Sequence, residues 1–280
     1  MKRIKQSLLK AASFIGCLSL LLSACTSGEQ GMPEPGELQP LEITADIEPQ
    51  TRAAGTEPDV TATNYDKRAF VTNDRIRVTN SKNAATTADY YYDGTRWLPV
   101  IASGSGITTT GGETFTAFYP VSFATIQAIQ TSYDAFWKSN KLVASATAIG
   151  NQASFRFIPA AAKITVVVEY IADRTGQSVK VKGAAVLTMG GTASEEITLL
   201  GLKTTGTKHT YVGIINPGNS KYFTITVVTN NGTQAYSGTK DLLAGHNYIY
   251  NFSSTNNLIL NSVSVEGFND QKEVSGGEAT

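Results

Sequence analysis

Leu41-Glu42-Ile43-Thr44-Ala45-Asp46-Ile47-Glu48 is the stretch of sequence that best indicates how this chain folds. Every second residue is apolar, namely Leu41, Ile43, Ala45 and Ile47. Successive side chains of a strand point to opposite faces, so the alternation predicts a strand with one buried face. Pro40 and Pro49 bound it, and proline cannot continue a hydrogen-bonded ladder. The pattern therefore predicts a short, separate strand that packs on a β-rich body.

An export signal precedes this strand. The first ten residues carry four Lys or Arg, and the apolar run 11–22 is shorter than the ~20 residues that span a bilayer. Leu22-Ser23-Ala24-Cys25 resembles the lipobox at which bacterial lipoproteins are cut and acylated. We therefore expect a signal peptide over residues 1–24 and a lipid on Cys25. The short apolar run argues against the alternative, a transmembrane anchor with a chance cysteine.

Cysteine content and charge exclude several classes of function. The chain has two cysteines, and the other, Cys17, lies in the signal, so no disulfide, metal cluster or thiol nucleophile is expected after cleavage. Lys and Arg balance Asp and Glu at 23 each, and removal of residues 1–24 takes away four bases and no acids. The mature chain is then mildly acidic, which argues against nucleic acid as a partner.

The residues around the first strand form a tether and a linker. Residues 26–37 are rich in Gly, Pro and acids, which favours an extended chain, and residues 53–58 form a small-residue linker open to proteases. Arg52 is the only Lys or Arg between the signal peptide and Lys67. Without further evidence, a solvated linker residue is the preferred interpretation of Arg52, and a protease cleavage site is the alternative. We assign residues 25–52 to a lipidated tether and strand.

The remaining sequence predicts two successive β-sandwich domains. Asp93-Gly94 between two aromatic runs predicts a hairpin over residues 89–98, while residues 123–133 fit either a short helix or a loop. Residues 163–170 form the most β-branched run and predict a central strand. Turn signals at roughly 8–12-residue spacing continue to residue 265. The expected domains are 53–152 and 153–270, followed by a polar tail, 271–280.

Six segments, taken in order, show a family resemblance. They are Asp74–Val78, Tyr91–Trp97, Phe118–Pro120, Phe155–Ile164, Leu243–Tyr248 and Val265–Asp270. Together they resemble the fimbrillin family of Bacteroidales, the lipoprotein-derived type V pilins that include the minor-fimbria-like proteins. The resemblance covers nearly the whole chain from the lipobox onward.

The resemblance implies an all-β fold of two tandem Greek-key (transthyretin-like) β-sandwich domains and a place in a cell-surface fimbria. It implies export as an outer-membrane lipoprotein acylated on Cys25, then cleavage by an arginine-specific surface protease between Arg52 and Ala53. Cleavage would remove the strand whose inward face is Leu41, Ile43, Ala45 and Ile47. A strand of another fimbrial subunit would then fill the vacated groove by donor-strand exchange, and a host or bacterial surface ligand is a further partner.

The resemblance leaves the subunit's place in the fibre open. Residues 258–265 fit either the last strand of the second domain or a strand lent to a neighbour. The polar tail 271–280 lacks an alternating apolar face, which favours a tip or accessory subunit. Phe268 occupies the position of a tryptophan-like residue in the family, and its role is left open.

The sequence gives no warrant for an enzyme, a cofactor or a metal. His209 and His246 are the only histidines, and neither has Cys, Asp or Glu at metal-ligand spacing. A Ser-x-x-Lys pattern at Ser7 lies within the signal peptide. We therefore expect a protein without catalytic residues.

Two other functions remain as alternatives. Aromatic rings on the predicted hairpin, above all Tyr91 and Trp97, would suit a surface lipoprotein that binds glycans by stacking, although core packing is the more common role of such rings. An anchor subunit that keeps its lipid is the other alternative.

Overall fold

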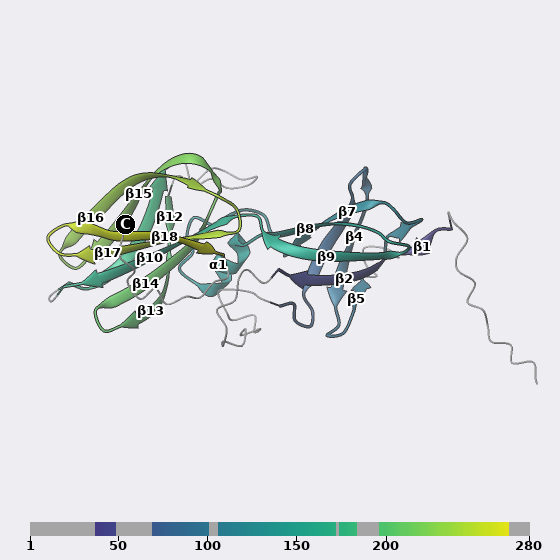
Figure 1. Ribbon diagram of the computed structural model, residues 1–280. Coiled ribbons are helices and arrows are strands. Elements are labelled where there is room, and N and C mark those ends of the chain that lie inside the picture. The colour runs from purple at the N-terminus through teal and green to yellow at the C-terminus, as the bar shows by residue number, and fades with distance from the viewer. Residues whose placement is uncertain (1–36, 49–68, 101–105, 172–173, 184–195, 269–280) are drawn as a thin grey trace, which may run out of the picture. The chain divides into compact units, whose positions relative to one another are not determined.

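The structure, a computed structural model, describes residues 37–48, 69–100, 106–171, 174–183 and 196–268. This part of the chain consists of strands and one short helix, which confirms the predicted all-β class (Figure 1). Two clusters of buried apolar side chains form, one mainly from the strands up to β9 and one mainly from the strands after it. No helix among the described residues is long and apolar enough to cross a membrane.

The first core lies within one curved, seven-stranded sheet in the order β2-β9-β8-β7-β3-β4-β5. Neighbouring strands are antiparallel except β2 and β9, which run parallel. A separate pair joins β1 to β6. The strands are β1 (Gln39–Pro40), β2 (Glu42–Ile47), β3 (Arg75–Asn80), β4 (Asn83–Tyr92), β5 (Trp97–Pro99), β6 (Thr108–Thr109), β7 (Thr114–Tyr119), β8 (Leu142–Thr147) and β9 (Gln152–Pro159).

The predicted aromatic hairpin is confirmed as β4 and β5, in which Tyr92 lies opposite Trp97. The Asp93 carboxylate accepts hydrogen bonds from the backbone N–H groups of Thr95 and Arg96 at 2.7 and 2.8 Å. Gly94 has φ +105°, a conformation that side chains rarely adopt. The Asp-Gly pair thus forms the turn through its own chemistry.

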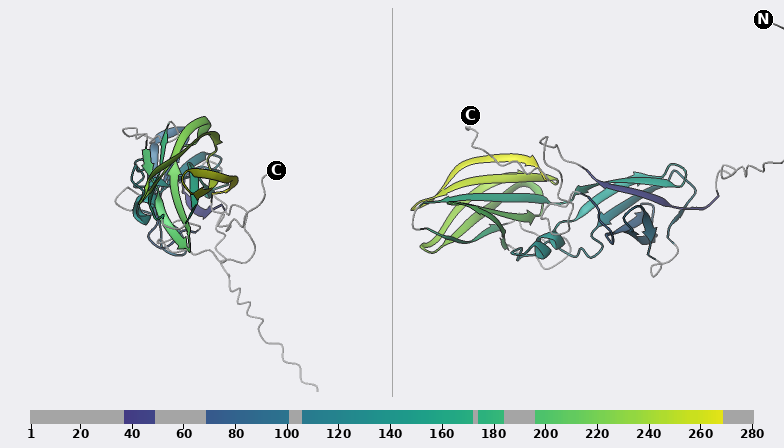
Figure 2. Two further views of the ribbon diagram at one scale, coloured as in Figure 1. Left: turned by 90° about the vertical axis from the view of Figure 1, so that its left-hand side faces the viewer. Right: turned by 90° about the horizontal axis from the view of Figure 1, so that it is seen from below.

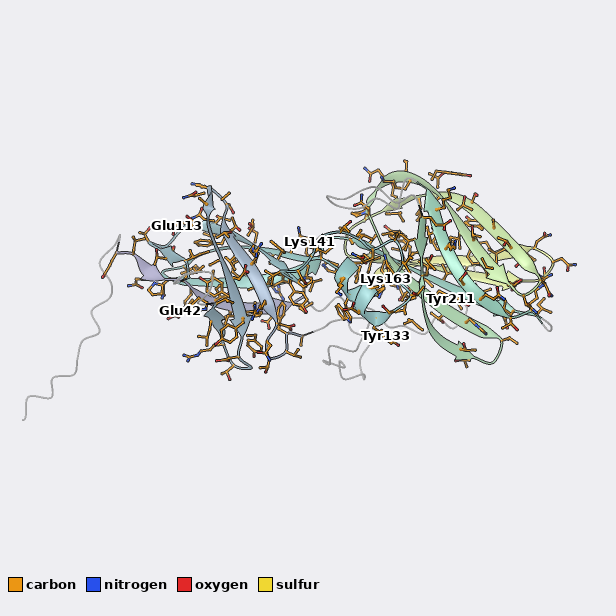
Figure 3. All side chains as sticks on the ribbon, turned by 180° about the vertical axis from the view of Figure 1, so that it is seen from behind. Glu42, Glu113, Tyr133, Lys141, Lys163 and Tyr211 are labelled. Atoms are coloured by element: carbon orange, nitrogen blue, oxygen red, sulfur yellow. The ribbon has the colours of Figure 1, made fainter. Side chains whose placement is uncertain are left out.

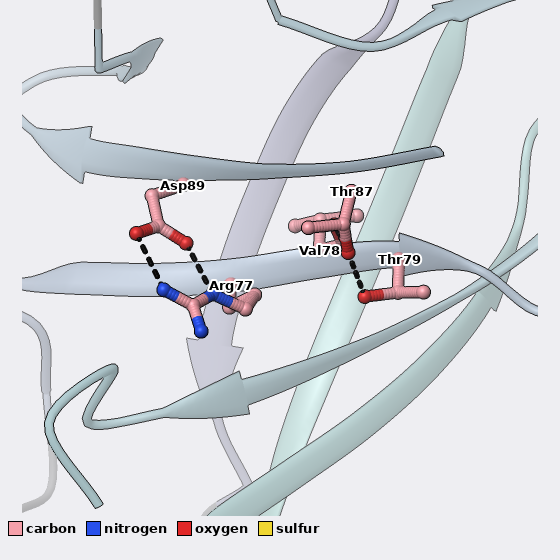
Figure 4. Close-up of polar contacts among 5 residues, drawn as sticks. All are labelled: Arg77, Val78, Thr79, Thr87 and Asp89. Carbon is pink, nitrogen blue, oxygen red and sulfur yellow. Dashed lines mark hydrogen bonds and ion pairs between the residues drawn. The ribbon is translucent and has the colours of Figure 1, made fainter. Parts of the chain in front are cut away.

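Polar pairs on the outer face fix the register of β3 against β4 (Figure 4). Arg77 donates from Nε and a terminal nitrogen to the two carboxylate oxygens of Asp89, at 2.6 and 2.9 Å. Two residues further along β3, the hydroxyl of Thr79 is hydrogen-bonded to that of Thr87 on β4. Val78, between Arg77 and Thr79 in the sequence, points to the opposite face, where it is fully buried. A slip of one residue would place Arg77 in the core.

The second core lies between a five-stranded sheet, β13-β14-β10-β17-β18, and a four-stranded sheet, β12-β11-β15-β16 (Figures 1 and 2). The chain crosses between the sheets after β10, β12, β14 and β16, as in a Greek-key sandwich. The strands are β10 (Ala162–Tyr170), β11 (Gly176–Gly183), β12 (Glu196–Thr198), β13 (Leu200–Thr205), β14 (Lys208–Ile215), β15 (Gly218–Thr229), β16 (Gly232–Leu242), β17 (His246–Ser254) and β18 (Leu258–Gly267).

The β-branched run predicted as a central strand is β10, which lies between β14 and β17. Ile164, Val166, Val168 and Tyr170 all point into the second core and are at most 2% exposed. Figure 3 marks Lys163 on β10 and Tyr211 on the neighbouring β14. Because β14 and β17 lie along its two edges, the backbone groups of β10 form hydrogen bonds on both sides.

The expected domain boundary between residues 152 and 153 was placed too early. β9 begins at Gln152 and belongs to the first sheet, where Phe155 and Phe157 are buried in the first core. After β9, the residues of the second core begin at Ala161. Sequence alone suggested the earlier boundary because β9 and β10 follow one another closely. Their partners, which decide the domain, lie far away in the chain.

Residues 123–132 of the ambiguous segment are not helical, and helix α1 (Tyr133–Ser139) begins at its last residue. The Ser132 hydroxyl caps the helix by accepting a hydrogen bond from the Ala135 N–H at 3.2 Å. Ile126 and Phe136 are buried in the second core, although they precede β8 and β9 of the first. The chain thus contributes to the second core before it completes the first.

Candidate functional site

The candidate site is the apolar surface covered by strand β2, here called the acceptor groove. Leu41, Ile43 and Ile47 are 5 to 6% exposed, and Ala45 is partly buried. All four pack against the first core. Glu42, Thr44 and Asp46 are exposed on the other face, and Figure 3 marks Glu42 there. The four residues predicted as an inward face are thus together on one side of β2.

Backbone hydrogen bonds hold this segment along its length. In the described part of the chain β2 pairs with β9 alone, so it forms an edge of the sheet. The Leu41 N–H donates to the Ile107 carbonyl at 2.8 Å, and the Glu48 N–H donates to the Phe157 carbonyl at 2.9 Å. Between these ends, Glu42 to Ile47 lie in parallel register with Gln152 to Phe157.

Polar side chains add only exposed contacts to this ladder. The Thr44 hydroxyl donates to the Ser154 hydroxyl at 2.8 Å. Asn151 Nδ2 donates to the Pro40 carbonyl at 3.1 Å, and Gln152 Nε2 donates to Glu42 Oε2 at 3.4 Å. Exposed hydrogen bonds of this kind contribute little net stability because water offers the same partners. The apolar face therefore dominates the energy that holds β2.

The groove is lined by side chains that the sequence reasoning did not single out. Ala153, Phe155 and Phe157 on β9 are at most 1% exposed. The ring of Phe70 lies edge-on to Phe157 at 5.3 Å and to Trp97 at 5.0 Å. The alternation Ala153-Ser154-Phe155-Arg156-Phe157 is the same signal as in β2 and marks a buried face, but it does not name the partner strand.

The buried position of Trp97 favours core packing, the more common role of such rings, over ligand stacking. Its side chain is 7% exposed and belongs to the first core, where the Tyr92 ring lies 5.3 Å away. Tyr91 is partly buried and points to the opposite face. Trp97 therefore offers no free ring face on which a sugar could stack, because its hydrophobic area is already used in packing.

The last described strand is held within the second domain. β18 pairs with β17 from Leu258 to Gly267, and Leu258 and Leu260 pack against the second core. Phe268 is fully buried there, and its N–H donates to the Gly245 carbonyl at 2.9 Å. Phe268, whose role the sequence left open, is thus a core residue that fixes the end of β18.

The two histidines lie beside tyrosine rings and a backbone carbonyl. His209 lies between Tyr170 and Tyr211, at centroid distances of 4.8 and 6.5 Å, and burial raises the pKa of both tyrosines. His246 Nδ1 lies 2.9 Å from the Ala244 carbonyl oxygen. Within the part of the chain that is described, no group of His, Cys, Asp and Glu could hold a metal ion.

Several predicted sites lie outside the described residues. They are the signal peptide 1–24, the lipidation site Cys25, the cleavage site Arg52 and Ala53, and the tail 271–280.

Two solved structures share the fold. A candidate cell adhesion protein from Bacteroides ovatus is similar with a TM-score of 0.61 and 21% identity, over 84% of this chain and 100% of that one. Another from Bacteroides uniformis has a TM-score of 0.52 and 16% identity, over 71% of this chain and 93% of that one. This chain has the fold of these Bacteroides proteins. No protein-family model and no curated protein matches its sequence.

A fimbrial protein shows a weaker likeness. The tip fimbrial protein Mfa3 from Porphyromonas gingivalis has a TM-score of 0.44 and 10% identity, over 74% of this chain and 96% of that one. A likeness at this level carries no argument about function.

Proposed function

We propose that this chain is a structural and adhesive subunit of a cell-surface fimbria, assembled when strand β2 is exchanged for a strand of another subunit. One observation carries the proposal: β2 is an edge strand that buries Leu41, Ile43 and Ile47 in the first core. Its fold, shared with candidate cell adhesion proteins, supports the same conclusion.

The proposed route begins with export as a lipoprotein. The chain is acylated on Cys25 and held at the outer membrane through its lipid. A surface protease specific for arginine then cuts between Arg52 and Ala53, in the linker that follows β2. The cut separates β2 from the body, to which it is afterwards bound only by non-covalent contacts.

The energy at stake is large enough to drive assembly. Burial of a large apolar side chain contributes ~1.5–3 kcal/mol, so loss of Leu41, Ile43 and Ile47 would cost about 5–9 kcal/mol. The stability of a whole domain is about 5–15 kcal/mol. A subunit without β2 would therefore expose an apolar groove beside the unpaired edge of β9, which is a template for another strand.

The covalent link between β2 and the body explains why assembly would wait for cleavage. While β2 is covalently linked, its effective concentration at the groove is far above that of any separate strand. The resident strand therefore blocks the groove during export. Cleavage removes this advantage at the cell surface.

We place the subunit at a tip or accessory position. Leu258, Leu260 and Phe268 tie β18 to the second core, so lending β18 to a neighbour would disrupt its own domain. A subunit that receives a strand but keeps β18 suits a position that ends or decorates a fibre.

The deciding experiment is the N-terminal sequence and intact mass of the protein recovered from the surface of its own bacterium. A start at Ala53 without lipid, together with high-mass ladders, supports the proposal. The variant Arg52→Lys keeps the charge but not the arginine, and it should retain the lipid and lose the ladders. A wild-type start at acylated Cys25 contradicts the processed subunit, and co-purifying fimbriae would then indicate an anchor.

A further inference from the structure

We infer that the acceptor groove selects an incoming strand whose inward residues run large, large, small, large, a pattern that strand β18 of a second copy of this chain lacks. The inference rests on the strand exchange proposed above and describes the partner by its side-chain pattern.

Burial of the resident strand defines the first part of the pattern. Three positions of the groove take a large aliphatic side chain and enclose it almost fully, at Leu41, Ile43 and Ile47. The position between the last two is occupied by Ala45, which is partly buried. An incoming strand that leaves one of the three enclosed positions empty would leave a cavity in the first core.

The register with β9 explains why the third position is small. Ile43 lies opposite Ala153, and Ala45 lies opposite Phe155, whose side chain is 1% exposed. A large residue thus faces a small one at these two rungs, whereas at the next rung Ile47 faces Phe157 and both are large. A branched or aromatic side chain at the third position would compete with the Phe155 ring for the same space.

The outer face of β9 adds a polar preference. Thr44 shares a hydrogen bond of 2.8 Å with Ser154. Asp46 lies opposite Arg156 in the register, so an acid at this position faces a base. Lysine or arginine there would place like charges side by side, which is destabilising on a sheet. The favoured partner therefore carries a polar residue and an acid between its inward residues.

Strand β18 of another copy does not fit this pattern when it runs parallel to β9, as β2 does. With Leu258 and Leu260 at the first two positions, Ser262 fits the third but Ser264 leaves the fourth without a large side chain. With Ile259 at the first position, Asn261 would place an amide in an apolar pocket. Unpaired burial of such a polar group is costly.

The test uses the full chain with a site-specific protease sequence inserted between Arg52 and Ala53. After cleavage the released segment remains available as competitor, and a fluorescent peptide of residues 38–48 is followed by anisotropy. Unlabelled peptides then compete with this probe. Four of them cover residues 38–48, one with the native sequence and one each with Ile47→Ser, Ala45→Leu or Glu42→Gln. The fifth covers residues 255–265, which places Leu258 at the position of Leu41. The uncut chain is the control and should not bind the probe.

We expect the peptide with Ile47→Ser and the 255–265 peptide to compete about ten- to hundredfold more weakly than residues 38–48, because one large pocket stays empty. Ala45→Leu should weaken competition about tenfold, whereas the outward Glu42→Gln should change it by less than about twofold. Equal competition by residues 255–265 would overturn the selectivity and leave strand exchange intact. Failure of the probe to bind the cut chain would instead contradict strand exchange itself.

Discussion

The side-chain amide of Gln130 forms two hydrogen bonds with the backbone of Ile214. Gln130 Nε2 donates to the Ile214 carbonyl at 2.9 Å, and the Ile214 N–H donates to Gln130 Oε1 at 2.8 Å. Ile214 lies beyond the last residue of β14 that pairs with β13. The amide thus takes the place of a neighbouring strand and satisfies backbone groups that would otherwise be buried without partners.

Replacement of Gln130 by alanine should therefore be strongly destabilising. Gln130 is fully buried, and Gln130→Ala would leave both the N–H and the carbonyl of Ile214 unpaired. An unsatisfied buried polar group costs ~1–3 kcal/mol, so we expect a loss of about 2–4 kcal/mol in the stability of the second domain. Chemical denaturation measures it, and Gln152→Ala, at an exposed glutamine, is the matched control. Equal, small effects in both variants would contradict this role.

Truncation of the inward face of β2 should destabilise the first domain. Ile43→Ala removes a side chain that is 6% exposed, and buried isoleucine-to-alanine changes cost ~2–5 kcal/mol. Asp46→Asn, on the exposed face of the same strand, should stay within about 0.5 kcal/mol of wild type. Guanidinium titration followed by Trp97 fluorescence, with Trp137→Phe in both variants and in the reference, reports on the first core. If the two variants unfold at the same concentration, β2 does not contribute to that core as the structure implies.

The alternation of residues 41–47 was enough to predict the strand, its buried face and the all-β class, because a period of two is a local property of the chain. The same holds for the Asp93-Gly94 turn, where two adjacent residues determine the backbone. What these patterns lack is the identity of the partner strand. Nothing local says that β2 runs parallel to β9 rather than antiparallel to a nearer strand.

The errors in the sequence interpretation have the same origin. The boundary near residue 152 failed because Phe155 and Phe157 pack with Ile43 and Phe70, which are distant in the chain. The choice between core packing and ligand stacking for Trp97 was left open because the sequence does not show that Phe70 lies against its ring. Gln130 was overlooked altogether, since an isolated glutamine carries no periodic signal. Long-range packing decided each of these cases.

Phe268→Ala should weaken the second domain even though it lies at the end of the last described strand. Its side chain is fully buried in the second core, and buried phenylalanine-to-alanine changes cost ~3–5 kcal/mol. Ile259→Ala, at a residue that is 49% exposed on β18, is the control and should change stability by less than about 0.5 kcal/mol. Hydrogen exchange should show faster exchange along β18 in Phe268→Ala. Unchanged protection of β18 would show that Phe268 does not fix this strand.

Glu113 should make the first domain sensitive to acid. The hydrogen bond that the Thr109 hydroxyl donates to Glu113 Oε2 holds the pKa of Glu113 below its usual value, and the bond from the Thr110 backbone N–H acts in the same direction. Thr109 also lies opposite Gln39 in the β1–β6 pair. A glutamate with a lowered folded pKa adds stability above its unfolded pKa of about 4.3, and this is lost as the pH falls through the folded value.

We therefore expect wild type to lose more stability than Glu113→Gln between about pH 4.5 and pH 3, with parallel profiles above that range. Asp93, whose pKa is lowered by backbone hydrogen bonds from Arg96 and Thr95, is present in both proteins, so their difference isolates Glu113. Thermal unfolding across this pH range gives the measurement, and Glu42→Gln on the exposed face of β2 is the charge-matched control. If Glu113→Gln loses stability as steeply as wild type below pH 4.5, the bond to Thr109 is not what stabilises the carboxylate.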